Sequence, residues 1–404
     1  NAETGAYEPA PGFPVDLPQN RDYRDAVIGS VAVGPLFGDG VPYIVTATNH
    51  GLVYVLHPDG NNHAGGPFVA GFPVSADEPD NTTALTFAHG NAFLSSPVLA
   101  DLDLDGMLEI IAAAYDQQGY AWKVTDEDND GEADRLPGWP VPLNSKPEFG
   151  LVGPEKVCET DMPAQVLGTP VVAILDPDHP DADISTHPAV IIPSTETCNE
   201  SMIPTGRVYA IYWNGLENED GPFLPDWPAK TLAPAGDSLP IPPLTIGSTS
   251  SPAAAYYQGE LLVGVGTFFW FPQMIHWANN KVEMETLGSG VNLGVSANGT
   301  FGKFEDNDDL WYFFPTAGFL NATEGNFYLE SFNVVGWRLG DAAFDYRKHF
   351  EDINFFVNPV LADLNSDGRQ EMISGSGGYV IHAADVDLAE PDGWPKFTQN
   401  WSTS

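Results

Sequence analysis

Basic residues are scarce in this chain of 404 residues. Fifteen Lys and Arg stand against 56 Asp and Glu, which leaves a net charge of −41 at pH 7. A surface of this sign repels nucleic-acid backbones and anionic membranes, so both are excluded as natural partners. Such a charge is tolerated best in salty, calcium-containing water, where cations screen the repulsion. We therefore expect an exported protein, located extracellularly or at the cell surface.

Long apolar runs and cysteines are also lacking. No run of about 18 apolar residues occurs, so no membrane span is predicted. The first five residues resemble no leader peptide, and we expect the signal peptide to be removed or to lie outside this chain. The two cysteines, Cys158 and Cys198, could close a loop of about 40 residues with a disulfide that stabilises by about 3–4 kcal/mol. Two free, buried thiols are the alternative.

Recognisable catalytic motifs are absent from the sequence. The nine histidines are scattered, with no His-Glu-x-x-His pair, and no Gly-x-Ser-x-Gly or phosphate-binding glycine loop occurs. Among 56 acidic residues, two neighbouring carboxylates are no evidence of acid–base catalysis. Disorder is excluded, because 43% hydrophobic and 12% aromatic residues supply ample core. The sequence thus predicts a folded protein that is not an enzyme.

What the chain does have is an acidic loop, repeated between apolar strands. Oxygen ligands at loop positions 1, 3, 5 and 9, a backbone carbonyl at position 7 and Gly at position 6 are typical of Ca²⁺ loops. A loop at 101–109 follows this pattern, and so do loops at 126–134 and 363–371. The glycines are Gly106, Gly131 and Gly368. The predicted ligands are Asp101, Asp103, Asp105, Met107 and Glu109 in the first loop, Asp126, Asp128, Asp130, Glu132 and Asp134 in the second, and Asp363, Asn365, Asp367, Arg369 and Glu371 in the third.

These loops predict two to three Ca²⁺ sites. Mg²⁺ is less suited, because it demands tight octahedral geometry and gives up water reluctantly. An acidic turn that is merely solvated is the alternative for each loop. Two further acidic clusters, at 176–183 and 306–309, have irregular spacing and are weaker candidates.

A second repeated phrase joins Gly or Asp to an aromatic residue and proline. It occurs at 12–15, 71–74, 138–141, 226–229 and 393–396, with a degenerate copy at 336–338. Proline cannot donate to a β-ladder, so the phrase belongs at the edge of a sheet. Abundant glycine and proline, 41 and 36 residues, suit many short strands joined by turns.

Strand, acidic loop and strand in this order resemble the FG-GAP repeat, also called the VCBS repeat, of integrin-type β-propellers and bacterial surface proteins. The likeness is closest at 101–109 and 363–371. It implies an all-β propeller whose four-stranded antiparallel blades carry Ca²⁺ in the loop between their first two strands. The resemblance says little about function, since such propellers serve adhesion, ligand binding and catalysis.

We expect one propeller domain over 1–404 with six recognisable blades. Their expected bounds are 28–75, 94–141, 168–229, 247–285, 291–338 and 355–396, with a closing strand at 12–16 and insertions at 143–167 and 215–244. The chain opens on a blade-edge phrase and closes on residues that resemble the start of another blade. We therefore expect a seventh blade, incomplete here, to be completed by a continuing chain or by another polypeptide.

The expected function is that of an extracellular interaction module, which binds a protein or glycan through its loops. A structural subunit of a filament, sheath or surface layer, formed by self-assembly or with other subunits, is one alternative. The propeller of a polysaccharide lyase, or an accessory domain of a secreted peptidase, is another.

Overall fold

The computed structural model describes the parts of the chain that form its sheets and most of the loops discussed below. Described are residues 9–18, 25–76, 91–115, 117–143, 166–197, 204–216, 221–231, 250–267, 270–287, 291–292, 298–303, 309–315, 319–323, 326–330, 334–339, 345–348, 358–375, 380–384 and 396–397.

The described residues form six four-stranded antiparallel sheets, which we call blades 1 to 6 in chain order. Blade 1 contains β1 (Ala32–Gly34), β2 (Tyr43–Ala47), β3 (Leu52–Leu56) and β4 (Val74–Ser75). Blade 2 contains β5 (Val98–Ala100), β6 (Glu109–Ala113), β7 (Gln118–Trp122) and β8 (Val141–Pro142). Blade 3 contains β9 (Val171–Ala173), β10 (Ala189–Thr197), β11 (Pro204–Tyr212) and β12 (Ala229–Lys230).

The other three blades repeat this order. Blade 4 contains β13 (Ala253–Tyr257), β14 (Glu260–Thr267), β15 (Trp270–Ala278) and β16 (Lys281–Thr286). Blade 5 contains β18 (Thr300–Gly302), β19 (Trp311–Pro315), β22 (Val334–Arg338) and β23 (Asp345–Lys348). Blade 6 contains β24 (Val360–Ala362), β25 (Glu371–Gly375), β26 (Val380–Ala384) and β27 (Lys396–Phe397). The described helices are the 3-10 helix η1 (Gly60–Asn62) and α1 (Ala182–Thr186).

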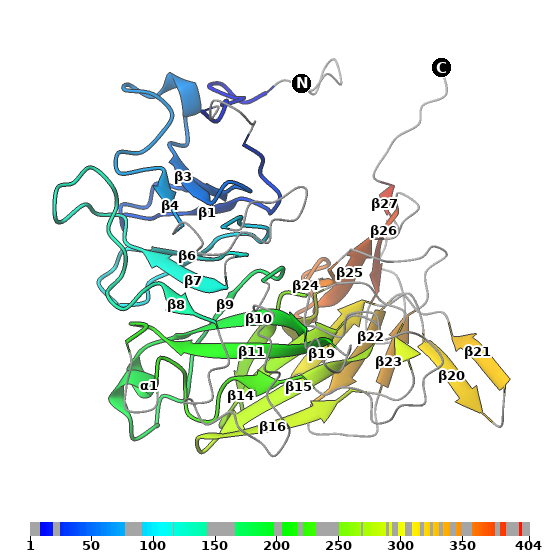
Figure 1. Cartoon of the computed structure of the whole chain (residues 1–404). Helices are drawn as coiled ribbons and strands as arrows, with labels where there is room; N and C mark the ends of the chain where they lie inside the picture. Colours follow the sequence, from blue (N-terminus) through cyan, green and yellow to red (C-terminus); the bar gives the residue numbers. More distant parts are fainter. Residues whose placement is uncertain are drawn as a thin grey trace, which may run out of the picture.

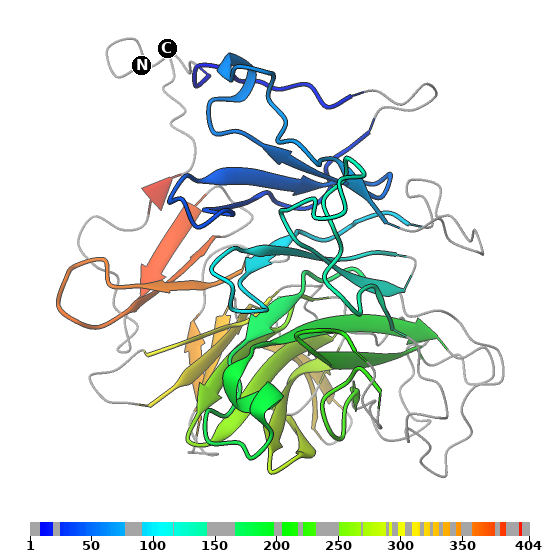
Figure 2. The ribbon, with the colours of Figure 1, turned by 90° about the vertical axis from the view of Figure 1, so that its left-hand side faces the viewer.

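The blades follow one another in sequence order around the molecule (Figures 1 and 2). Each first strand contacts the first strand of the next blade, from β1 through β5, β9, β13 and β18 to β24. This arrangement of antiparallel blades is a β-propeller, as the sequence predicts.

A chain of hydrogen bonds, which we call the inter-blade ladder, joins the blades just before their first strands. In each step a backbone N–H donates to a side-chain oxygen two residues before the first strand of the next blade. The steps are Ser30 to Ser96 (2.8 Å), Ser96 to Thr169 (3.1 Å), Thr169 to Ser251 (2.8 Å), Ser251 to Asn298 (2.7 Å) and Asn298 to Asn358 (2.9 Å). A small polar residue at one repeated position thus fixes each blade against its successor.

The core lies between the blades, where the faces of successive blades pack against each other. All five residues of β6 are buried, and so are all five of β19. Val45 of blade 1 shares a cluster with Ile110 of blade 2, and Trp311 of blade 5 shares one with Met372 of blade 6. Strands covered on both faces need apolar side chains on both, so they appear in the sequence as continuous apolar runs.

The Gly-aromatic-Pro phrase leads into the outer strand and touches the next blade. The four described X-Pro bonds of this phrase, at Pro14, Pro73, Pro140 and Pro228, are cis. The Gly71 carbonyl accepts from the Ala133 N–H of blade 2 at 2.9 Å, and Trp139 Nε1 donates to the Trp213 carbonyl of blade 3 at 3.0 Å. The phrase is therefore both a sheet edge and a contact between blades.

The observed bounds of blade 5 differ from the expected ones. The degenerate phrase at 336–338 lies in its third strand, and β23 is its outer strand, so the expected edge at 338 is wrong. An extra hairpin, β20 (Phe319–Thr323) and β21 (Asn326–Glu330), lies between its second and third strands and pairs with β17 (Val291–Asn292). The phrase lacks proline here, which removes the barrier to a position inside the sheet.

Some expectations fall outside the described residues. Cys158, Cys198 and most of the insertions at 143–167 and 215–244 are among them, so the disulfide stays a prediction. Among the described residues, no helix is long and apolar enough to cross a membrane.

Candidate metal centres

Two of the three acidic loops lie on blade 2. The first, 101–109, joins β5 to β6, and the second, 126–134, lies between β7 and β8. In a four-stranded antiparallel blade these two connections leave the same end of the sheet. The third loop, 363–371, joins β24 to β25 of blade 6 and is thus placed like the first.

The three loops share one hydrogen-bond pattern, although their sequences differ. In each, the position 6 N–H donates to the position 1 carboxylate: Gly106 to Asp101 at 3.1 Å, Gly131 to Asp126 at 3.0 Å and Gly368 to Asp363 at 3.0 Å. The position 2 N–H donates to the position 9 carboxylate, from Leu102 to Glu109, Glu127 to Asp134 and Leu364 to Glu371. The position 7 N–H donates to position 5, from Met107, Glu132 and Arg369.

The backbone also repeats. Position 4 is left-handed in every loop, with φ of 60° at Leu104, 61° at Asn129 and 63° at Ser366, and position 6 is a glycine with φ between 91° and 98°. Glycine adopts such angles without strain, which explains its place in all three loops. The three loops therefore share one backbone conformation at positions 4 and 6.

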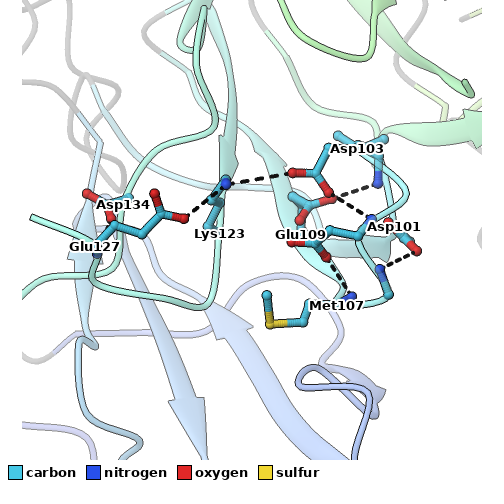
Figure 3. Close-up of polar contacts among 10 residues, drawn as sticks. Asp101, Asp103, Met107, Glu109, Lys123, Glu127 and Asp134 are labelled. Carbon is cyan, nitrogen blue, oxygen red and sulfur yellow. Dashed lines mark hydrogen bonds and ion pairs between the residues drawn. The ribbon is translucent and has the colours of Figure 1, made fainter.

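In the first loop three predicted ligands converge. Oxygens of Asp101, Asp103 and Glu109 lie within 4.8 Å of one another (Figure 3). Asp101 Oδ1 is buried without a hydrogen-bond partner, and Glu109 is 1% exposed at the start of β6. A buried carboxylate oxygen without a partner is costly, and a cation at this point would satisfy it.

The ionised form of Glu109 is disfavoured in the first loop, because this side chain is buried among other acidic groups. Burial raises its pKa to about 7; the Leu102 N–H bond opposes the shift, and the charges of Asp103, Asp105 and Asp101 reinforce it. A bound divalent cation would oppose this rise in pKa, because it favours the ionised form of each carboxylate that it contacts.

In the second loop Asp126, Asp128 and Asp130 converge within the same 4.8 Å limit. The last two are exposed, so this trio is more open to solvent than the first. Asp105 of the first loop and Asp134 of the second lie outside these trios, and each accepts a backbone N–H of its own loop.

The third loop has the same backbone but a different interior. The Asn365 amide nitrogen donates to Asp367 and Glu371, at 3.0 Å each. The amide occupies the position where the first loop brings carboxylates together. Among the described residues, only the first two loops show three converging acidic groups.

Lys123, at the end of β7, was not anticipated from the sequence. Its ammonium lies 3.2 Å from Glu127 of the second loop and 3.7 Å from Asp103 of the first (Figure 3). The hydrogen bond to Glu127 is the largest cause that raises its pKa. A lysine three residues before an acidic loop, in a chain with only 15 basic residues, was the available signal.

The cluster at 176–183 has other roles. Asp176 accepts from Tyr256 of blade 4 at 2.8 Å, and Asp181 caps α1 by accepting from Asp183 N–H. Asp176 thus links blades 3 and 4, and Asp181 begins a helix. Neither residue belongs to a group of converging carboxylates among the described residues. Asp306, Asn307 and Asp308 lie outside the described residues.

The donor set fits a hard cation. All predicted side-chain ligands offer oxygen, and the groups that converge in the two trios are carboxylates. Oxygen-only sets with several carboxylates suit Ca²⁺, Mg²⁺ or Mn²⁺, and a flexible loop of this length suits the larger Ca²⁺.

No family model matches this chain, and no curated protein matches it. Among solved structures, BBS1N in complex with ARL6DN, soaked with lead, is 10% identical over 90% of this chain and 81% of that one, with a TM-score of 0.44. The same complex soaked with mercury has a TM-score of 0.45 at the same identity and coverage. A chain of the Chaetomium thermophilum Polycomb Repressive Complex 2 bound to GSK126 is 10% identical over 91% of this chain and 71% of that one, with a TM-score of 0.39.

Proposed function

We propose that this protein is a calcium-loaded β-propeller of the FG-GAP type, exported from the cell, that serves as an interaction module. One observation carries the calcium assignment. The first acidic loop brings the carboxylates of Asp101, Asp103 and Glu109 together, and the buried Asp101 Oδ1 has no hydrogen-bond partner. The second loop repeats this backbone and brings three further carboxylates together.

Calcium would act structurally in these loops. It neutralises carboxylates that otherwise repel each other and fixes the connection between two strands. The first loop also packs on blade 1, where the Leu36 carbonyl accepts from the Leu108 N–H at 2.9 Å. A loop ordered by a cation would therefore stabilise the junction of blades 1 and 2.

The test is to remove calcium from metal-bearing protein and measure unfolding. We expect chelation to lower the melting temperature by many degrees, since free calcium at a thousandfold excess over Kd stabilises by about 4 kcal/mol per site. An unchanged melt, in protein shown by elemental analysis to have held calcium before, would rule the proposal out.

A substitution in the first acidic loop tests whether the change in melting temperature comes from calcium bound there. We expect Asp103→Asn to lose about one bound calcium per chain and to melt lower in calcium buffer. In chelator the variant should melt no lower than the parent protein, because it has one fewer of the carboxylates that repel each other there. Asp39→Asn is the matched control, because Asp39 is an exposed acid in the corresponding connection of blade 1. Equal losses in both variants would assign the effect to net charge.

The interaction role rests on the propeller and on loops gathered at the ends of its blades. The proposed partner is a protein or glycan on the extracellular side. A glycan array and a panel of extracellular matrix proteins, probed in calcium and in chelator, test this role. Binding that is saturable and lost in chelator supports it, and cleavage products from any arrayed glycan would replace it with an enzymatic role.

A further inference from the structure

The connection between β3 and β4 of blade 1 carries two histidines whose rings stack face to face. His57 directly follows β3, and His63 directly follows η1. Their ring centroids lie 3.5 Å apart, and the ring planes differ by 7°. The backbone brings them together, because Gly60 N–H donates to the His57 carbonyl at 3.0 Å and His63 N–H donates to the Gly60 carbonyl at 3.1 Å. We call this pair the histidine stack.

One carboxylate balances the charge of the histidine stack. Asp59 Oδ1 lies 3.2 Å from His63 Nδ1. Tyr43 of β2 packs on His57 with its ring centroid at 5.9 Å, and its hydroxyl donates to Asp39 at 3.1 Å. Among the described residues, the charges that act on the His57 ring are those of His63 and Asp59. A single carboxylate can compensate one imidazolium, so a second proton on the stack is left without a counter-charge.

The second proton is unfavourable while the stack is closed. Burial lowers the pKa of His57, the charge of His63 lowers it further, and Asp59 opposes the shift. The closed connection therefore binds fewer protons than an opened one, in which a histidine titrates near its ordinary value of about 6.5. Stability of the closed form is full above this pH and decreases as the pH falls through it.

Residues 10–14 are held against blade 1 by the same connection. The Gly12 carbonyl accepts from Asn61 N–H at 3.0 Å, and Asn61 Nδ2 donates to the Pro14 carbonyl at 2.8 Å. The contact is close, since a Cβ at Gly12 would lie 1.9 Å from the Asp59 carbonyl oxygen. Both hydrogen bonds end on one residue of η1, which lies between the two stacked histidines in the chain. The position of η1 thus determines whether residues 10–14 stay bound.

We propose that the histidine stack is a pH-sensitive switch that releases residues 10–14 from blade 1 in acid. At neutral pH the stack is closed, and Asn61 holds both carbonyls. When both imidazoles take up protons from the solvent, two like charges face each other at 3.5 Å and repel. The rings separate, η1 shifts, and the two hydrogen bonds of Asn61 break. This switch is independent of the calcium loops.

Hydrogen exchange of the whole chain between pH 7.5 and pH 5.0 tests the switch, with rates corrected for the intrinsic effect of pH. The readout is the segment 57–66, resolved by fragmentation to the Asn61 amide, which reports the contact to Gly12 directly. We expect its protection to fall at least about tenfold, centred between about pH 5 and about pH 6.5. Strand β6 of blade 2 is the internal reference and should keep its protection. A parallel loss in β6 would show global acid unfolding and would overturn the proposal.

Two substitutions remove the second charge in different ways. His57→Phe keeps a flat ring that can stack on His63 but takes up no proton, and His63→Gln keeps a donor for Asp59 without an imidazole. We expect the Asn61 amide to stay protected at pH 5.0 in both. The matched control is His187→Phe, because the His187 ring stacks on Trp213, at 4.4 Å, rather than on a second imidazole. This control should respond to acid like the parent protein.

Three results contradict the switch. These are an unchanged acid response in both stack variants, an equal loss of the response in His187→Phe, and a parent protein whose Asn61 amide ignores pH. The series is run in calcium and in chelator, and we expect the same response in both. A response confined to chelator would assign the effect to the acidic loops and overturn the switch. Failure of the calcium proposal is read separately, from the melting temperature at neutral pH.

Discussion

At the scale of single residues, Lys123 connects the two acidic loops of blade 2. Its ammonium contacts Asp103, a predicted ligand of the first loop. It also contacts Glu127, whose own N–H donates to Asp134, a predicted ligand of the second. The Lys123 ammonium, a monovalent cation, thus lies beside both acidic loops of blade 2.

We expect Lys123→Met to raise calcium affinity at the first loop about fivefold. Removing the ammonium abolishes its repulsion of Ca²⁺ and leaves Asp103 without a counter-charge, and both effects favour metal binding by about 1 kcal/mol together. Isothermal titration calorimetry measures the change. Lys281→Met, which removes an exposed lysine of blade 4, is the control, and an equal gain there would point to net charge alone.

At the scale of the elements, close packing between blades depends on glycines inside strands. Gly264 of β14 faces Tyr312 of β19, and a Cβ at this position would overlap the tyrosine ring. Tyr312 is fully buried at this junction of blades 4 and 5. Here glycine is required by the approach of a neighbouring side chain rather than by its backbone angles.

We expect Gly264→Ala to destabilise the protein by about 1–3 kcal/mol, the usual cost of overpacking. Chemical denaturation measures it as a lower urea midpoint at unchanged slope. An unchanged midpoint would show that the residues of this junction shift to accommodate the added methyl group with no loss of stability.

A second substitution at the junction of blades 4 and 5 should stabilise the protein instead. The Tyr312 hydroxyl is buried without a hydrogen-bond partner, and burial raises its pKa. We expect Tyr312→Phe to stabilise by about 1 kcal/mol, because the desolvation penalty of the hydroxyl disappears. A destabilised variant would reveal a hydrogen bond to this hydroxyl in solution.

At the scale of the whole molecule, the net charge of −41 opposes the compact state. Calcium and salt relieve this repulsion differently: calcium acts at a few sites, whereas salt screens every exposed pair. The two effects can therefore be separated by experiment.

We expect sodium chloride, raised from about 0.05 M to about 1 M, to increase the melting temperature in chelator, because the screening length shrinks from more than 10 Å to about 3 Å. The increase should be smaller in calcium-saturated protein, whose densest acidic loops are already neutralised. Differential scanning calorimetry measures both, and a melting temperature in chelator that ignores salt would contradict this account.

The sequence by itself determined the repeat, the all-β class and the three acidic loops, because these depend on local spacing. A glycine at position 6 and carboxylates at alternating positions impose the same turn wherever they occur, and all three loops have it. The fifth blade was misplaced because its edge phrase lacks proline and its extra hairpin interrupts the repeat.

Only the tertiary structure decided which residues meet across blades. Lys123 lies next to Asp103 because two connections leave the same end of one sheet, and the residues are 20 positions apart in the chain. The inter-blade ladder joins residues that are far apart in the chain, such as Ser30 and Ser96, 66 positions apart, or Asn298 and Asn358, 60 positions apart. Spacing along the chain determines a turn, whereas contacts between distant segments depend on how the whole ring packs.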